Sequence, residues 1–343
     1  MRQLKDIIIN HILTHGPMQI DAYWTLCLAH PEYGYYIKQD PLGASGDFTT
    51  APEISQLFGE MIGIWAGEQW VRLGKPQKIH LVEFGPGRGT LMADLLRIAK
   101  LIPDFAAALH VHLVETSPAL RAKQKEALQD WKVEWHDDLA SLSGNAPILM
   151  IGNEFLDVLP IRQYIRIQQG WRERVIGIQN NEQLIFGIGG QVTGIDFPQA
   201  RDGDIFEYAP SREAVYKKMT EKISNQGGSA LMIDYGHDRS ACGDTFQAIM
   251  RHEFVDVLDH QGDADLTSHV DFERLKLQIL NQEIAANIST QKDFLMRYGI
   301  VERAEQLKRN ASISQAKDID AALHRLLDGA QMGHMFKVLE AWK

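Results

Sequence analysis

Residues 79–90, IHLVEFGPGRGT, constrain the fold of this chain more than any other stretch. A short apolar run with an acidic residue near its end leads into three glycines at alternate positions, and a strongly helical segment, LMADLLRIAK, follows. Apolar runs of this length beside turn residues are typical of buried strands, and Thr90 is suited to cap the helix. The stretch therefore predicts a strand, a tight loop and a helix, which together open a nucleotide-binding βα unit.

The loop consists of Gly85, Gly87 and Gly89, and glycine allows the backbone to adopt positive φ or to approach a ligand closely. A dinucleotide fingerprint, G-x-G-x-x-G, would need glycine at position 90, where this chain has Thr90. The observed spacing, with Glu83 two residues before the first glycine, is similar to the first motif of S-adenosylmethionine (SAM) methyltransferases. In that motif the loop packs against the amino-acid part of the cofactor. The alternative is an ordinary tight βα turn, but the position between strand and helix favours a nucleotide-type ligand.

Strands and helices alternate along much of the remaining chain. Further strands are predicted at 109–116, 132–140, 146–151, 229–233 and 336–339, with helices between most of them. Helical segments between successive strands indicate a mostly parallel sheet with helices on both faces. The sequence therefore predicts an α/β, Rossmann-like fold.

Two regions are expected. Residues 1–75 are predicted to form a helical N-terminal region with a long loop that covers the cofactor or substrate, and one continuous helix is predicted from Pro52 to Gly74. Residues 76–343 are predicted to form the Rossmann-like domain. Within it, strand-like stretches between polar turns indicate a β-rich insertion at 161–207, and a helical insertion is expected around 271–328.

Polar residues follow the predicted strands at the carboxyl edge of the sheet, where α/β ligand sites form. Glu115 ends the second strand, where a carboxylate accepts hydrogen bonds from ribose hydroxyls; alternatively it faces the N-terminus of the next helix. Asp137 ends the third strand, near the expected adenine position, although adjacent acids are often only a solvated turn. Asn153 and Glu154 follow the fourth strand.

Composition narrows the classes of partner and compartment. A net charge of −10 argues against non-specific nucleic-acid binding and against a polybasic membrane anchor. Cys27 and Cys242 stand apart from any CxxC or Cys/His cluster, and the 13 histidines are scattered without HExxH, so no metal site is expected. The N-terminus lacks the features of a secretory or transit signal, and no apolar run is long enough to span a membrane. We therefore expect a cytoplasmic protein.

Several blocks together resemble the MidA-like family of SAM-dependent methyltransferases. In chain order they are YGYY at 33–36, GDFTTAPEISQLFGE at 46–60, VEFGPGRGTLMADLLR at 82–97, GNEFLDVLP at 152–160, IDYG at 233–236, DADLTSHVDF at 263–272 and MGHMFKVL at 332–339. They run nearly end to end in the family's order, and the long GDFTT block is far more specific than the glycine loop. Mitochondrial members of the family methylate an arginine on a complex I subunit during assembly.

The resemblance implies a class I methyltransferase that uses SAM and acts on a protein presenting an arginine, such as a respiratory-complex subunit or a related bacterial protein. It also brings Gly46 and Asp47, in the GDFTT loop, into the expected cofactor site. Asp234 and Asp271 are candidates for lining the cleft. For Asp47, Asp234 and Asp271, capping of a turn or helix is the alternative.

An arginine acceptor poses a specific chemical difficulty, because a guanidinium with a pKa above about 12 is a poor nucleophile. A carboxylate paired with it can orient the group, hold its charge away from the attacking nitrogen and help to remove the proton. Glu154 and Asp157 are the candidates, with Asn153 as a neutral hydrogen-bonding neighbour. For Asp157 the alternative is a cap of the turn before Leu159.

Two other functions compete with a protein arginine methyltransferase. One is a methyltransferase for a small molecule, which a deep enclosed pocket would favour over an open cleft. The other is an assembly chaperone that binds SAM only as a structural ligand. A nicotinamide oxidoreductase is disfavoured by the position of the third glycine. The oligomeric state is not predicted.

Overall fold

The computed structural model describes residues 2–38, 50–168, 170–180 and 182–343. Contacts divide the chain into two compact units, each assembled from three separate chain segments. The first unit comprises Met1–Phe48, Asp157–Ala214 and Arg239–His269, and the second comprises Thr49–Leu156, Val215–Asp238 and Val270–Lys343. The domain division predicted at residues 75 and 76 stays a prediction, and these contacts group the chain differently.

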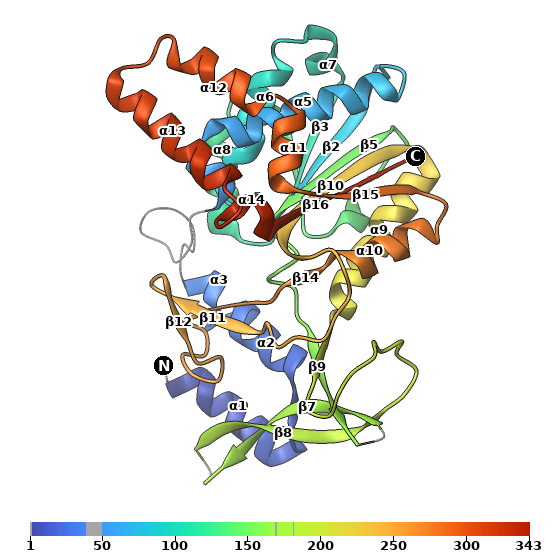
Figure 1. Cartoon of the computed structure of the whole chain (residues 1–343), viewed down its shortest axis with the longest axis vertical. Coiled ribbons are helices and arrows are strands. Elements are labelled where there is room, and N and C mark those ends of the chain that lie inside the picture. Colours follow the sequence, from blue (N-terminus) through green and yellow to red (C-terminus); the bar gives the residue numbers. More distant parts are fainter. Residues whose placement is uncertain (1, 39–49, 169, 181) are drawn as a thin grey trace. The chain divides into compact units, whose positions relative to one another are not determined.

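The second unit is built on a mixed sheet in the order β15-β16-β10-β5-β2-β3-β4, with β14 paired to β10 (Figure 1). Its strands are β2 (Ile79–Phe84), β3 (Leu109–Val114), β4 (Val133–His136), β5 (Ile148–Asn153), β10 (Gly228–His237), β14 (Val270–Asp271), β15 (Ala285–Thr290) and β16 (Phe336–Trp342). From β4 to β10 the strands are parallel, whereas β16 is antiparallel to both β10 and β15. The predicted α/β fold is confirmed. The edge strand β15 lies in the region predicted to be a helical insertion.

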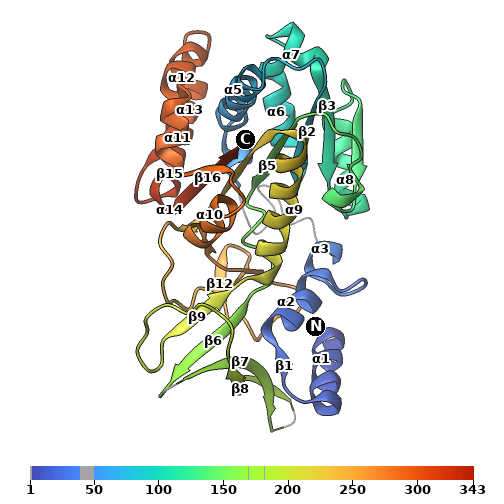
Figure 2. The same ribbon diagram turned by 90° about the vertical axis from the view of Figure 1, so that its right-hand side faces the viewer.

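Every residue of β2 is buried, as expected for the central strand of a parallel sheet that is covered on both faces. One face packs against α5 (Gln56–Arg72), α6 (Thr90–Ala99), α11 (Gln291–Arg297), α12 (Ile300–Lys308) and α13 (Ile313–Leu327). The helices α9 (Pro210–Gln226) and α10 (Phe272–Leu280) run along the other face (Figure 2). The remaining helices here are α4 (Ala51–Ile54), α7 (Pro103–Ala108), α8 (Pro118–Ala127) and α14 (Met332–Met335).

Two local predictions around the glycine loop are wrong. The helix expected to be continuous from Pro52 is broken at Ser55, which is extended with φ −163° and accepts a hydrogen bond from the Leu57 N–H, so it caps α5. At the start of α6, Gly89 takes the capping position with φ +85°, where Thr90 was expected. The Thr90 hydroxyl instead donates to the Glu53 carboxylate at 2.7 Å.

The first unit combines helices with two small sheets. Its helices are α1 (Arg2–His15), α2 (Ile20–Ala29) and α3 (Tyr35–Lys38). One sheet has the order β1-β7-β6-β9 with β8 on β7, and the other has the order β12-β11-β13. The strands are β1 (Met18–Gln19), β6 (Arg162–Ile167), β7 (Gly170–Gln179), β8 (Gln183–Val192), β9 (Ile205–Tyr208), β11 (Gln247–Met250), β12 (Glu253–Val255) and β13 (Asp265–Thr267). The strands predicted within 161–207 correspond to β6, β7 and β8.

The core of the first unit joins its three chain segments through α2. The Trp24 ring stacks on Phe246 at 4.9 Å between centroids, and its indole N–H donates to the Val158 carbonyl at 2.9 Å. The Tyr23 hydroxyl donates to the Val257 carbonyl at 2.7 Å. The polar atom of each of these two buried aromatic side chains thus has a hydrogen-bond partner.

Among the helices of the described ranges, none combines the length and the apolar character needed to cross a lipid bilayer.

A buried ion pair attaches α12 to α5. The Glu60 side chain is fully buried, and its carboxylate accepts hydrogen bonds from the Arg303 guanidinium at 2.7 and 3.2 Å and from the Gln56 amide at 3.0 Å. Hydrogen bonding to Glu60 raises the pKa of Arg303. Arg97 also lies 3.5 Å from Glu60, but its side chain is half exposed. Loss of Arg303 therefore leaves the buried carboxylate with only this weaker partner, which is destabilising because the charge remains out of water.

We therefore expect Arg303→Met to lower the free energy of unfolding by about 2 to 4 kcal/mol, measured by urea denaturation. The control is Lys100→Met, since Lys100 pairs with Asp130 where both side chains are exposed, at 53% and 73%. That change should cost below about 1 kcal/mol. Equal losses in the two variants would contradict the importance of the Glu60 pair.

Candidate active site

The strand order of the sheet reverses at β2 and β5, so the carboxyl ends of these strands are the expected ligand edge. The chain runs from β2 outward to β3 and β4, and then returns to begin β5 on the other side of β2. Open α/β sheets bind ligands where the strand order reverses in this way. The glycine loop follows β2 and Asn153 ends β5, so both lie at this edge.

The glycine loop adopts backbone conformations that other residues disfavour. Gly85, Gly87 and Gly89 have φ of +58°, +53° and +85°. A Cβ on Gly85 would also come within 3.2 Å of the Phe155 ring. Helix α6 begins at Gly89 without a side-chain cap, so the first N–H groups of this helix are available to an acceptor on a ligand.

Two buried oxygen atoms at this edge have no hydrogen-bond partner among the described residues, namely Oε2 of Glu83 and Oδ1 of Asn153. Side chains alternate along a strand, and Leu81 and Ile151 face the same hydrophobic core, so Glu83 and Asn153 point to the same face of neighbouring strands. Burial raises the pKa of Glu83 to about 8. Buried acceptors without donors are rare in folded proteins and indicate a ligand that donates hydrogen bonds.

Glu154 follows Asn153 with a backbone φ of +50°, which is uncommon for a residue with a side chain. Its Oε1 atom accepts hydrogen bonds from the Ala51 N–H and from the Asn153 amide nitrogen, both at 3.1 Å. Such strained positions persist only where surrounding contacts impose them, and they cluster at active sites. Sequence reasoning identified Glu154, and the structure adds its connection to the start of α4.

Gln124, on α8, is the site residue that sequence reasoning missed. It is fully buried, and its amide nitrogen donates to the Gly87 carbonyl at 2.7 Å and to Oε2 of Glu115 at 3.3 Å. Its amide oxygen accepts from the Trp135 indole at 2.8 Å. A signal was available in the sequence, because Gln124 takes the place of an apolar residue in the i, i+4, i+8 row between Leu120 and Leu128.

Glu115 is buried after β3. Its Oε1 atom accepts from the Ser117 N–H at 2.8 Å, and burial raises the pKa of its carboxyl group. The hydrogen bond to Ser117 fits the alternative of a helix N-terminal carboxylate, and the bond from Gln124 ties Glu115 to the glycine loop. The ribose-binding role of Glu115 stays a prediction.

Asp137 lies at the surface. Its side chain is 83% exposed and pairs with the Arg121 guanidinium at 2.6 Å. Its neighbour Asp138 caps a 3₁₀ turn through the Ala140 N–H at 2.8 Å and pairs with Lys218 at 2.6 Å, and these contacts lower the pKa of Asp138. These contacts fit the alternative of a solvated turn, and the adenine-binding role of Asp137 stays a prediction.

Asp234 and Asp271 make the capping and turn contacts that were the alternative to lining a cleft. Asp234 is fully buried, and its carboxylate accepts from the Leu156 N–H at 2.9 Å and from the Tyr235 N–H at 3.0 Å. It thereby shapes the loop that carries Glu154. Asp271 caps α10 by accepting from the Arg274 N–H at 3.1 Å.

Asp157 belongs to the first unit. It is buried there, and its backbone carbonyl accepts from the Ser268 N–H and from the Arg212 guanidinium, both at 3.2 Å. Gly46 and Asp47 lie outside the described residues.

Residues 61–290 match the sequence model of the S-adenosyl-L-methionine-dependent methyltransferase family, and the chain belongs to this family. Its resemblance to MidA-like methyltransferases is thereby confirmed. A crystal structure of a methyltransferase-type protein from Burkholderia thailandensis, bound to S-adenosyl-homocysteine, is similar with a TM-score of 0.84 and 24% identity, covering 100% of this chain and 92% of that one. The SAM cofactor and the class of enzyme predicted from the sequence are confirmed.

Curated relatives are similar over nearly the whole chain. The protein arginine methyltransferase NDUFAF7, mitochondrial, of Xenopus laevis is 34% identical, with 98% of this chain and 84% of the relative covered. The protein of the same name in Danio rerio is 33% identical, with 96% and 84% covered. The cytoplasmic localisation predicted from the sequence is contradicted, because these relatives are mitochondrial proteins.

We expect Gln124→Leu to weaken SAM binding by about tenfold or more, because the substitution leaves the Gly87 carbonyl, Glu115 and Trp135 without their shared partner. Calorimetric titration measures this change. Glu126→Gln is the control, since Glu126 is exposed on the same helix and should leave the affinity unchanged. Equal affinity in wild type and Gln124→Leu would exclude a positioning role for Gln124.

Glu83 makes the unfolding free energy depend on pH in the protein without SAM. Its folded pKa of about 8 lies above the ordinary value of 4.5, so the folded state holds the proton more tightly. The stabilisation is complete below about pH 4.5 and is lost as the pH rises through about 8. We expect the free energy of unfolding of the wild type, measured by urea denaturation, to fall relative to that of Glu83→Gln as the pH rises from about 4.5 to about 8. A difference that stays constant with pH would rule out a buried protonated Glu83.

Proposed function

We propose that this methyltransferase transfers a methyl group to an arginine of a protein, and that the protein is a subunit of a respiratory complex or a related bacterial protein. The arginine assignment is supported by the similarity to relatives named protein arginine methyltransferase NDUFAF7. The observation that carries the proposal is the set of acceptor oxygens at the carboxyl ends of β2 and β5. They are the buried Oε2 of Glu83, the buried Oδ1 of Asn153 and the partly buried carboxylate of Glu154, and such oxygen atoms suit ligands that carry cationic N–H groups.

The residues after β2 and β3 fit SAM. The first N–H groups of α6 and the open loop of Gly85, Gly87 and Gly89 suit the carboxylate of its amino-acid part, and Glu83 suits its ammonium group. Glu115 is assigned to the ribose hydroxyls. From the sequence, Asp137 is assigned to the adenine amine, and Gly46 and Asp47 are assigned to the loop beside the cofactor. When bound, SAM supplies a methyl group activated on a sulfonium.

Glu154 is assigned to the guanidinium of the acceptor arginine. Its Oε1 atom is already held by Ala51 and Asn153, so the carboxylate is oriented before the acceptor arrives. A carboxylate hydrogen-bonded to one edge of the guanidinium concentrates positive charge there and leaves another nitrogen to act as the nucleophile. Asn153 aligns the group through a neutral hydrogen bond. Asp157 is assigned as the second carboxylate on the strength of the sequence alone.

We expect Glu154→Gln to keep SAM binding but to lower methyl transfer by about a hundredfold or more, because the amide keeps the shape and loses the charge. In contrast, Gly87→Val should abolish SAM binding, since a β-branched residue is strongly disfavoured at φ +53°. Calorimetric SAM titration and a transfer assay separate the two effects. Full transfer activity in Glu154→Gln would disprove the carboxylate mechanism.

The acceptor is identified with tritiated methyl-SAM and a protein extract from cells in which the gene for this chain has been deleted. Labelled methylarginine after acid hydrolysis of the protein fraction supports the proposal. Label only in the small-molecule fraction would assign a metabolite substrate instead. Intact SAM binding without any label would favour the chaperone function.

A further inference from the structure

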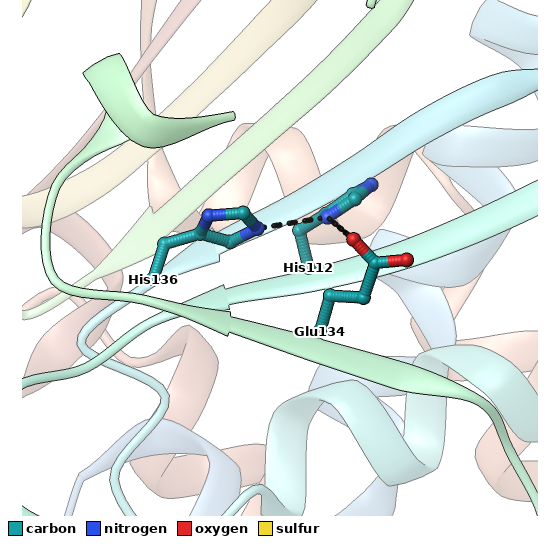
Figure 3. A group of neighbouring side chains, drawn as sticks. All are labelled: His112, Glu134 and His136. Carbon is teal, nitrogen blue, oxygen red and sulfur yellow. Dashed lines mark hydrogen bonds and ion pairs between the residues drawn. The ribbon is translucent and has the colours of Figure 1, made fainter. Parts of the chain in front are cut away.

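Three histidines on adjacent strands of the second unit form a hydrogen-bonded row. His80 on β2, His112 on β3 and His136 on β4 are joined by contacts of 2.9 Å, from Nδ1 of His80 to Nε2 of His112, and of 3.0 Å, from Nδ1 of His112 to Nε2 of His136. Glu134 precedes His136 by two residues and pairs with His112 in the strand register, so its side chain points to the same face. Figure 3 shows His112, Glu134 and His136 converging.

The last three residues offer ligand atoms at separations that suit a metal ion. Nδ1 of His112 lies 3.0 Å from Nε2 of His136 and 3.8 Å from Oε2 of Glu134, and all three atoms lie within 4.8 Å of one another. Bonds of about 2.0 to 2.1 Å in a tetrahedral zinc site place the ligand atoms about 3.3 Å apart. Small movements of the Glu134 and His136 side chains, which are at least partly exposed, would bring the three atoms to these separations.

Hydrogen bonds around the cluster already hold the two imidazoles in place. The Ser141 hydroxyl donates to the Asp138 carbonyl at 2.7 Å, so its oxygen is left to accept the hydrogen on Nδ1 of His136 at 2.9 Å. This arrangement leaves Nε2 of His136 as a lone pair directed at His112. On the other side, Nε2 of His112 has His80 as its partner. Such outer partners orient the histidine ligands of metal sites.

The accessibility of the cluster agrees with metal binding. His112 is buried, whereas the Glu134 side chain is 53% exposed. An ion can therefore enter from the Glu134 side, and the buried ring holds it on the sheet.

We propose that His112, Glu134 and His136 bind one divalent transition-metal ion, of which zinc fits best, with water as the fourth ligand. Two imidazoles and one carboxylate select zinc and its neighbours over magnesium and calcium, which prefer oxygen ligands. The ion would connect the short edge strand β4 to β3 and so stabilise the end of the sheet. Sequence reasoning expected no metal site, because these ligands lie on two strands and form no local motif.

The test is a titration of the purified full-length protein, freed of metal by a chelator, with cobalt chloride in a buffer containing magnesium. The wild type should bind one equivalent of Co²⁺ with the visible absorption of a tetrahedral site, and Zn²⁺ should displace it. His136→Gln and Glu134→Gln should each weaken binding by about a hundredfold or more, since even the loss of an outer partner weakens metal sites 10- to 100-fold. Both residues are at least partly exposed, and circular dichroism verifies the fold of each variant.

Two controls separate this site from other histidines. His110→Gln removes an exposed histidine two residues before His112 on the same strand. His15→Gln breaks the exposed His11–His15 pair on α1, whose stacked rings lie 4.5 Å apart. Both variants should retain one tight equivalent of Co²⁺. The proposal is overturned if the wild type binds no Co²⁺ at millimolar concentration, if His136→Gln binds as tightly as the wild type, or if His15→Gln abolishes binding.

Discussion

The complete burial of β2 at the centre of the parallel sheet is the constraint on which the second unit depends. A strand that is buried on both faces needs a layer of helices on each side of the sheet. Its backbone N–H and C=O groups must form hydrogen bonds with the neighbouring strands. Only at its carboxyl end, in the turn from Phe84 to Gly89, does the chain leave this environment. The positive φ values of the glycines allow that exit within a few residues, and the turn lies beside the end of β5.

The carboxyl ends of β2 and β5 have the polar character of a binding site, because buried polar atoms there lack hydrogen-bond partners among the described residues. Glu83 and Asn153 each have a buried oxygen atom without a hydrogen-bond partner among the described residues. The backbone of Glu154 has a positive φ, which is strained for a residue with a side chain. Each of these features opposes folding, so each must be offset by the packed sheet and by supporting contacts such as those of Asp234. The features that indicate a binding site are thus ones that the surrounding packed sheet has to stabilise.

Much of the fold was predictable because hydrophobic periodicity and glycine spacing are local signals. The strands that carry the site and the helix after the glycine loop lie at their predicted positions to within a few residues. The break at Ser55 was not predictable, since one residue in extended conformation leaves the apolar pattern of the flanking helices unchanged. Strand β15 was missed because it pairs with β16, which lies about fifty residues further along the chain. Gln124 was missed because its partners come from two other elements.

The sequence by itself determined the βα unit, the class of fold and the chemistry of the cofactor, because each depends on residues that are close together in the chain. Tertiary structure alone decided how three separated segments combine into each unit and which polar groups share a partner. It also placed His112 beside Glu134 and His136, although 21 residues separate the first histidine from the carboxylate. The register of neighbouring strands determines such contacts, and a linear sequence does not specify which strands will be neighbours.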